Sequence, residues 1–285
     1  MKAVVAALLV AVGVAAAGCG GSSVTGEPRP LPPTSRLLAG QVQVVAYADG
    51  DVRICPDYAI ALDLGPARPP NCRNGLRAVG VRVDALPSHS TKPRERWGYV
   101  YLVGRYRGET FWVTSQRRSA PKTPSRPFLA TPPCAPPTGG WRLVAPTLAQ
   151  QDAITAYQRR HRGDITSVAY FHDDTIPTVA ATHPQRVRAL LGGVWPHQLC
   201  VVGSRYSHAL INRVRARMVR LLESRSTAAR YGWISGAGGI SCSERGQPTT
   251  PLEVLIETPR LRALLRQTPP GLVVVDATFR PLPRL

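Results

Sequence analysis

Residues with the chemistry of nucleophiles, acids and bases are present, but their spacing completes no catalytic motif. The segment Gly232–Gly236 surrounds a serine with glycines without reproducing G-x-S-x-G, the pattern that holds a nucleophile on a sharp turn. Gly236–Gly239 is not followed by Gly-Lys-Ser/Thr, so it predicts a turn or bulge and no phosphate loop. His172–Asp174 could supply an acid and a base, yet its place between two apolar runs predicts a hairpin turn. We therefore assign no catalytic residue.

Aromatic residues near Gly98 offer a second kind of chemistry, which is stacking. Trp97, Tyr99 and Tyr101 lie beside Arg94 and Arg96, and rings next to arginines can hold a sugar or a base between them. The same residues alternate with apolar ones, as in a strand that is buried on one face. We expect half-buried strand aromatics here and keep stacking as the alternative.

The cysteines indicate cross-links and not a metal. Five cysteines follow Cys19, and none of them belongs to a C-x-x-C or lies near a closely spaced histidine pair. We therefore expect no metal and no cofactor. An exported chain can form disulfides, and an odd number leaves one cysteine over. The expected pairs are Cys55 with Cys72 and Cys134 with Cys200, which leaves Cys242 outside both.

The first residues are typical of an export signal. Lys2 gives a positive start, and residues 3–17 form an apolar run shorter than the roughly 20 residues that span a bilayer. The run ends in Ala-Ala-Gly-Cys, which resembles the lipobox of bacterial lipoproteins. Residues 1–18 are thus predicted to be a lipoprotein signal peptide, with Cys19 lipidated at the extracytoplasmic face of the cell membrane. The alternative is an ordinary secretory signal cut near Ala17.

The balance of charge limits the expected partners. A formal net charge of +19 at pH 7 predicts a surface that attracts anions, although codon bias in a GC-rich genome would also enrich arginine. Outside a cell membrane the anions are lipid head groups, wall polymers and acidic proteins. We expect contact with the membrane through the lipid anchor and with an envelope protein or anionic polymer. Nucleic acid is not expected in that compartment, and the oligomeric state does not follow from the sequence.

One helix concentrates this charge. Residues 207–222 have the strongest helical periodicity in the chain, with an apolar stripe that includes Ile211 and Met218. Arg213, Arg217 and Arg220 recur at helical spacing away from the stripe, so they should share one exposed face. That face is either plain solvated surface or a surface for an anionic partner.

The elements that carry these residues divide the chain into two halves. Residues 19–36 predict a flexible tether, and 37–118 predict a β domain with a hairpin around Gly108. Its short strands indicate a small barrel, which could be OB-like, or a sandwich. The proline-rich residues 119–140 predict an extended linker and a domain boundary. Residues 141–285 alternate helices and strands, so we expect an α+β protein overall.

The second half contains an internal repeat. Arg186–Leu191 and Arg260–Leu265 share the pattern R-x-R-A-L-L, and each lies between two apolar runs that predict strands. We predict two β-β-α-β units in a two-layer α+β domain. Chance similarity in a chain rich in arginine, alanine and leucine is the alternative.

The chain resembles a family of actinobacterial envelope lipoproteins of unknown function over most of its length. The matching pieces are Cys55–Cys72 with two prolines before the second cysteine, the hairpin Gly98–Thr114, Pro133-Cys134 with Gly139–Trp141, and Leu199–Val202 before the long helix. The resemblance implies no assigned activity. The β-β-α-β unit also resembles, weakly, the pro-regions of α-lytic-type proteases.

Together these features predict a non-enzymatic, membrane-anchored envelope lipoprotein that binds a protein partner or an anionic envelope component. Two alternatives remain open. One is a pro-region-like chaperone or inhibitor of an exported hydrolase, and the other is an enzyme with no recognisable motif.

Overall fold

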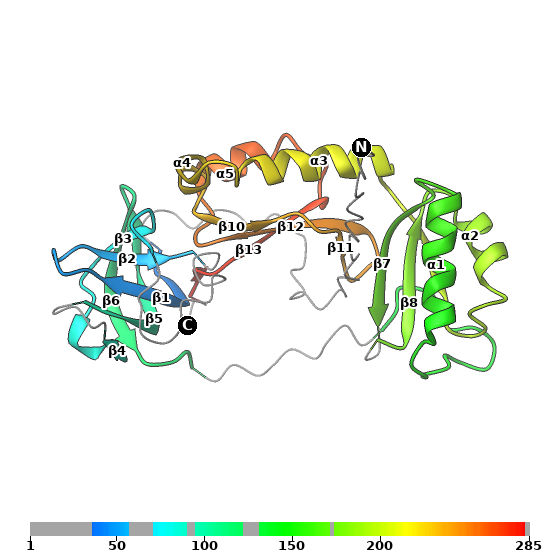
Figure 1. Ribbon diagram of the computed structural model, residues 1–285, viewed down its shortest axis with the longest axis horizontal. Coiled ribbons are helices and arrows are strands. Elements are labelled where there is room, and N and C mark those ends of the chain that lie inside the picture. Colours follow the sequence, from blue (N-terminus) through cyan, green and yellow to red (C-terminus); the bar gives the residue numbers. More distant parts are fainter. Residues whose placement is uncertain (1–35, 57–70, 90–94, 122–130, 172–173, 283–285) are drawn as a thin grey trace, which may run out of the picture.

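The computed structural model describes residues 36–56, 71–89, 95–121, 131–171 and 174–282. Within these ranges the protein is α+β, as expected, and its strands form three sheets arranged along an elongated molecule (Figure 1). The predicted signal peptide, Cys19, most of the tether and residues 172–173 lie outside the described ranges. No helix within those ranges combines the length and the apolar character needed to cross a bilayer.

A closed five-stranded barrel lies at one end of the molecule (Figure 1). Its strands, in chain order, are β1 (Leu38–Ala46), β2 (Val52–Cys55), β3 (Leu76–Val79), β5 (Arg96–Arg107) and β6 (Thr110–Arg117). They are arranged in the order β1-β2-β3-β6-β5, and the pairing of β5 with β1 closes the ring. Neighbours are antiparallel except β3 and β6, which are parallel. The short elements η2 (Val83–Ala85) and β4 (Ser88–His89) precede β5.

Strand β5 pairs along both of its edges, which explains why the strands form a closed barrel and not a sandwich. Strand β5 has 12 residues and an irregularity in its register between Val103 and Gly104, which bends the strand. It therefore pairs with β6 from Tyr101 onward and with β1 from Arg96 to Gly104. A strand with partners on both edges leaves no open edge at that position.

The hydrophobic core of the barrel continues into the C-terminal half. Inward-facing residues such as Val44, Leu102 and Phe111 pack with Trp233 and Phe279 in one buried cluster. Phe111 and Phe279 stack with ring centroids 4.2 Å apart. The last strand, β14 (Arg280–Pro281), then pairs with β1. The two halves thus share a core, although the proline-rich segment separates them in sequence.

The first sheet of the C-terminal half lies at the far end from the barrel (Figure 1). The strands of this sheet and the helices next to them are, in chain order, α1 (Leu148–Arg160), β7 (Ile165–Phe171), β8 (Ile176–Ala181), α2 (Pro184–Leu191) and β9 (Cys200–Gly203). The central strand β8 is antiparallel to β7 and parallel to β9. Helix α1 starts at Thr147 with a capping box. Its Ile154 and Tyr157 pack with Val187 and Leu191 of α2 over one face of the sheet.

The second sheet lies between the barrel and the first sheet (Figure 1). Its strands and the helices that cover it are, in chain order, α3 (His208–Arg220), α4 (Arg225–Arg230), β10 (Ile234–Ala237), β11 (Ser241–Cys242), β12 (Pro248–Val254), α5 (Pro259–Leu265) and β13 (Val273–Ala277). Strand β12 is antiparallel to β10 and β11 and parallel to β13. Met218 of α3, Ala228 of α4 and Leu261 of α5 pack against β12 and β10, so all three helices cover one face.

Gln247 fixes the two sheets to each other. Its side-chain amide donates to the carbonyl of Gly203 at the end of β9 (2.9 Å), and its carbonyl oxygen accepts from the backbone N–H of Arg205 (2.9 Å). Gly246 approaches Thr178 and Val202 so closely that a Cβ there would lie 3.0 Å from the Thr178 side chain. The turn before β12 therefore packs directly on the first sheet.

Candidate functional site

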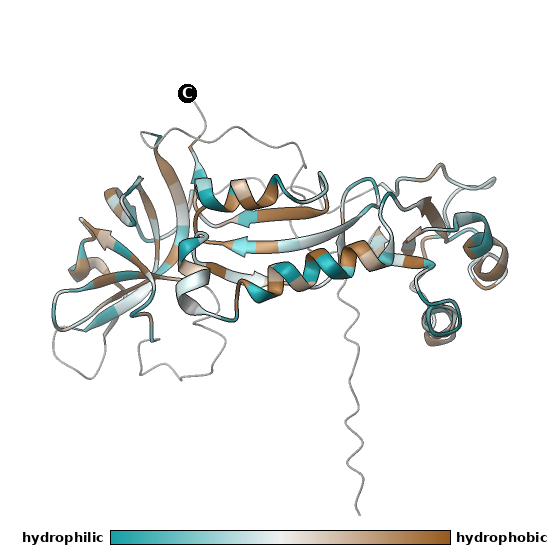
Figure 2. Ribbon diagram, turned by 90° about the horizontal axis from the view of Figure 1, so that it is seen from above, coloured by the Kyte–Doolittle hydropathy of each residue, from teal (hydrophilic) through white to brown (hydrophobic). Residues whose placement is uncertain are grey.

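The helical layer formed by α3, α4 and α5 carries the arginines that the sequence singled out. Arg213 and Arg220 are exposed on α3, and Arg217 between them is half-buried. The Arg217 guanidinium donates to the Gln267 side chain at 2.7 Å, just beyond α5. The three arginines therefore share the side of α3 that borders α5. Polar and apolar residues alternate along α3, as expected for a helix with one buried stripe (Figure 2).

The rest of the layer is basic too. The further exposed arginines on or next to these helices are Arg215, Arg230, Arg260 and Arg266. The acidic residues of the same helices and their flanks are Glu223 and Glu257, and Glu257 is held by Arg262 at 2.7 Å. Among the described residues, Arg213, Arg215, Arg217 and Arg220 make no ion pair. Within the described ranges, the layer thus presents positive charge that acidic side chains do not neutralise.

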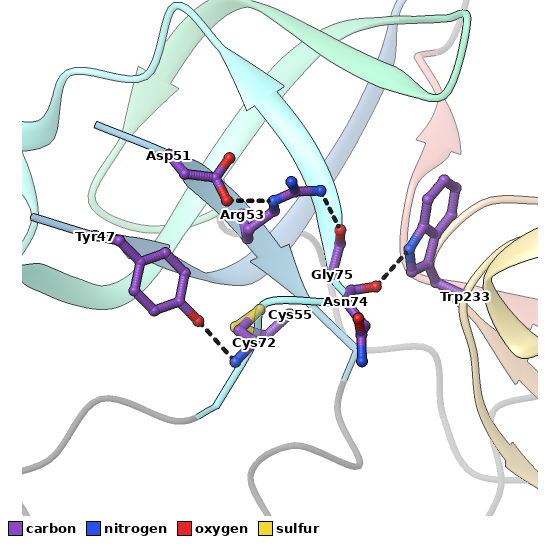
Figure 3. The surroundings of a disulfide bond; sticks show 8 residues. All are labelled: Tyr47, Asp51, Arg53, Cys55, Cys72, Asn74, Gly75 and Trp233. Atoms are coloured by element: carbon purple, nitrogen blue, oxygen red, sulfur yellow. Dashed lines mark hydrogen bonds and ion pairs between the residues drawn. A yellow bond between two sulfur atoms is a disulfide. The ribbon is translucent and has the colours of Figure 1, made fainter. Parts of the chain in front are cut away.

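The Cys55–Cys72 corner of the barrel differs, because its arginines are already paired. The disulfide forms as expected, with Cα atoms 5.4 Å apart. Close to it, Arg53 binds Asp51 at 2.8 Å (Figure 3), while Arg73 binds Asp49 at 2.6 Å and lies over the ring of Tyr47. The backbone N–H of Cys72 donates to the Tyr47 hydroxyl at 2.8 Å (Figure 3). These contacts support the loop ends and leave little charge for a ligand.

The second expected disulfide also forms. Cys134 and Cys200 are bonded with Cα atoms 5.7 Å apart, so the end of the proline-rich segment is tied to β9. Cys242 of β11 is outside both disulfides, as predicted, and packs in the same cluster as this bond. A surface pocket of about 460 Å³ next to the disulfide is lined by residues that include Pro133, Trp141 and Arg188. Its Arg188 guanidinium is already engaged with the Val201 carbonyl at 2.6 Å.

A buried carboxylate lies at the centre of a second group of titratable side chains. Asp164 is 7% exposed and accepts hydrogen bonds from the Tyr157 hydroxyl at 2.9 Å and from Arg186 at 3.3 Å, with the His183 Nδ1 at 3.2 Å. Burial raises the pKa of the Asp164 carboxyl. The hydrogen bonds and the nearby positive charge lower this pKa by more than burial raises it, so it lies below its usual value. Burial and the Asp164 hydrogen bond raise the pKa of Tyr157 to about 12. The Asp164 carboxylate therefore stays ionised at neutral pH, with hydrogen-bond donors around it. This arrangement suits a role in anchoring the α1–β7 and β8–α2 junctions.

The other candidates from the sequence lie in strands and turns, except that residues 172 and 173 of His172–Asp174 fall outside the described ranges. Ser235 lies within β10, and positive φ angles at Gly238 and Gly239 make the turn that follows it. Trp97 packs half-buried against Val45 and Tyr47 on the barrel exterior, while Tyr99 is 43% exposed. Within the described ranges no group of three or more histidine, cysteine or acidic residues could hold a metal ion. Sequence reasoning overlooked Trp112, which is 49% exposed on β6.

Comparison with known proteins adds no relative. No protein-family model, curated protein or solved structure matches the chain.

Proposed function

We propose that the chain is a non-enzymatic envelope lipoprotein, anchored through Cys19 at the extracytoplasmic face, that binds an anionic partner with its helical layer. The observation that carries the binding role is the set of exposed arginines on α3 and its neighbours without acidic partners. Unneutralised charge on a rigid, packed layer attracts anions over about a Debye length. The partner is an acidic protein or an anionic polymer or lipid of the envelope.

A duplication accounts for the architecture that displays this layer. Strand β8 pairs antiparallel with β7 and parallel with β9, and β12 has the same relation to β10 and β13. In both units the helix between the parallel strands, α2 or α5, has a proline in its first turn. We propose that these units are copies, with β11 as an insertion in the second.

The binding role is tested by charge reversal on α3. The full chain carrying Cys19→Ala would be titrated with anionic vesicles and with purified wall material, so that no lipid anchor contributes to binding. Arg213→Glu with Arg220→Glu should weaken binding, and adding Arg217→Glu should abolish binding to the vesicles. Binding of the parent chain should fall with salt, because the Debye length shrinks from about 10 Å at 0.1 M to about 3 Å at 1 M.

A matched control separates a specific surface from net charge. Arg118, Arg142 and Arg205 are exposed elsewhere in the molecule, and their reversal to Glu changes the total charge by the same amount. If the control triple loses as much affinity as the α3 triple, or if binding ignores salt, the helical layer is ordinary solvated surface. A pull-down of the lipidated protein that recovers one stoichiometric exported hydrolase would instead favour the chaperone or inhibitor role.

A further inference from the structure

The outer wall of the barrel carries an exposed aromatic ring inside a group of arginines. Trp112 on β6 lies opposite Val79 of β3 on one side and opposite Arg105 of β5 on the other. Two residues away, Thr110 lies opposite Arg77 and Arg107 in the same two strands. Residues that pair directly point to the same face of a sheet, as do residues two apart along a strand. These six side chains therefore form one patch, here called the Trp112 wall.

The burial of the neighbouring residues confirms that the wall faces outward. Ala78 and Phe111, which alternate with wall residues, are buried in the barrel core, whereas Trp112 is 49% exposed. Arg77 and Arg107 are exposed, and Arg105 is half-buried. With strands about 4.8 Å apart and side chains on one face about 6.8 Å apart along each strand, the wall spans about 10 Å by 7 Å. That is the footprint of one or two hexose rings.

The charge of the wall is unpaired within the described chain. Arg77, Arg105 and Arg107 appear in no ion pair there, and Glu109, which follows Gly108 in the β5–β6 turn, does not bridge to any of them. No described ring or guanidinium stacks on Trp112. This contrasts with Arg73 at the other barrel corner, which is held by both Asp49 and Tyr47.

Each part of the wall selects a feature of the ligand. An indole face has a negative quadrupole and stacks on rings whose C–H groups point toward it, as the axial hydrogens of a pyranose do. Arginine forks bind carboxylates and phosphates in a planar, paired geometry. A ligand that uses both is a ring with an attached anionic group. A nucleotide would satisfy the same groups, and the extracytoplasmic location, which belongs to the proposed function, is what favours a sugar.

We propose that the Trp112 wall binds an acidic glycan, namely a polymer of uronic acid or phosphorylated sugar residues. Trp112 stacks on the sugar ring, and Arg77, Arg105 and Arg107 bind its anionic groups. The site is distinct from the arginines of the helical layer, since it lies on the barrel and selects rings as well as charge.

The test uses the full chain with Cys19→Ala and three probes: a uronic-acid oligosaccharide, a neutral oligosaccharide of equal length, and a single-stranded oligonucleotide. Binding is followed by calorimetry and by the change in tryptophan fluorescence. The acidic glycan should bind at least about tenfold more tightly than the neutral one. Trp112→Ala should weaken binding about tenfold or more, whereas Trp112→Tyr, which keeps a stacking ring, should retain most of it. Arg105→Gln should weaken it, and Arg205→Gln, outside the wall, should not.

Several results would overturn the proposal. Equal binding by Trp112→Ala and the parent chain would show that the ring plays no part. Equal affinity for the neutral and the acidic glycan would show that the arginines do not contribute to binding. Tighter binding of the oligonucleotide would reassign the wall to nucleic acid. Fractionation of the native chain reports on its location separately, so failure of the envelope assignment and failure of the glycan site can be told apart.

Discussion

The indole N–H of Trp233 donates to the backbone carbonyl of Asn74 at 3.1 Å, joining residues 159 positions apart (Figure 3). Trp233 precedes β10 in the C-terminal half, and Asn74 lies in the turn between Cys72 and β3 of the barrel. The same indole meets the ring of Tyr106 edge-on, with centroids 6.1 Å apart. Trp233, which follows α3 and α4 in the chain, therefore completes the core of the barrel.

We expect Trp233→Ala to destabilise the whole protein, because it empties part of the barrel core. The loss should be about 3–5 kcal/mol in the free energy of unfolding, as for other buried aromatic truncations. Denaturant unfolding followed by circular dichroism measures it. Trp233→Phe, which retains most of the packing and loses the hydrogen bond, should cost clearly less. A barrel signal that unfolds at an unchanged denaturant concentration would show that the shared core is not needed.

The Asp164 group should make stability depend on acid. A carboxyl whose folded pKa lies below its unfolded value stabilises the fold above that unfolded value, near 3.8, and this contribution is lost as the pH falls through the folded pKa. Asp164→Asn should therefore reduce stability at pH 7 by about 2 kcal/mol, the usual contribution of hydrogen bonds to a charged group. It should also flatten the loss of stability below pH 4. Equilibrium unfolding at pH 7 and at pH 3 gives both values, and parallel pH profiles would rule out this role for Asp164.

Tyr157 should show the opposite pH dependence. Its pKa is raised to about 12, so its neutral form stabilises the fold fully below the unfolded value near 10, and the contribution is lost as the pH rises through 12. In an alkaline absorbance titration, one tyrosine of the native protein should ionise late, near pH 12. That late step should be missing in Tyr157→Phe. A wild-type titration that is complete by pH 11 would contradict the prediction.

Removing the disulfides should destabilise the protein in a defined order. The Cys55–Cys72 bond closes a loop with a sequence separation of 17, and Cys134–Cys200 closes one of 66. Chain-entropy arguments give about 3 kcal/mol for the shorter loop and about 4 kcal/mol for the longer one. The paired serine variants, compared by denaturant unfolding, should follow this order. Non-reducing peptide mapping that recovers Cys242 joined to Cys134 or Cys200 would contradict the pairing itself.

Cys19→Ala should release the protein from the membrane, because lipid on Cys19 is the anchor that we propose. Fractionation of cells that express the variant, together with the intact mass of the wild-type chain, measures this. The wild type should carry acyl chains and sediment with membranes. Unchanged membrane retention of the variant, with no acyl mass on the wild type, would exclude the lipoprotein assignment.

Local signals in the sequence determined most of the elements. Period-two alternation around Gly108 predicted the β5–β6 hairpin, and the helical periodicity of residues 207–222 predicted α3 within two residues of its ends. The repeated segments Arg186–Leu191 and Arg260–Leu265 fall within α2 and α5, the helices of the two predicted units. The short helix α4 and the strands β10, β11 and β14 were not predicted, because a few residues carry too little periodicity to be recognised.

Tertiary structure alone decided which edges and faces meet. Local periodicity sets the type of an element, whereas pairing β1 with β5 depends on the free energy of burying a core gathered from the whole chain. That is why the sequence left barrel and sandwich open, and why it could not place Trp233 and Phe279 in the barrel core. The β5–β6 pairing places Arg105 opposite Trp112, and the parallel pairing of β3 with β6 brings Arg77 and Val79 beside them. Since such pairing joins residues distant in sequence, no local pattern encodes it.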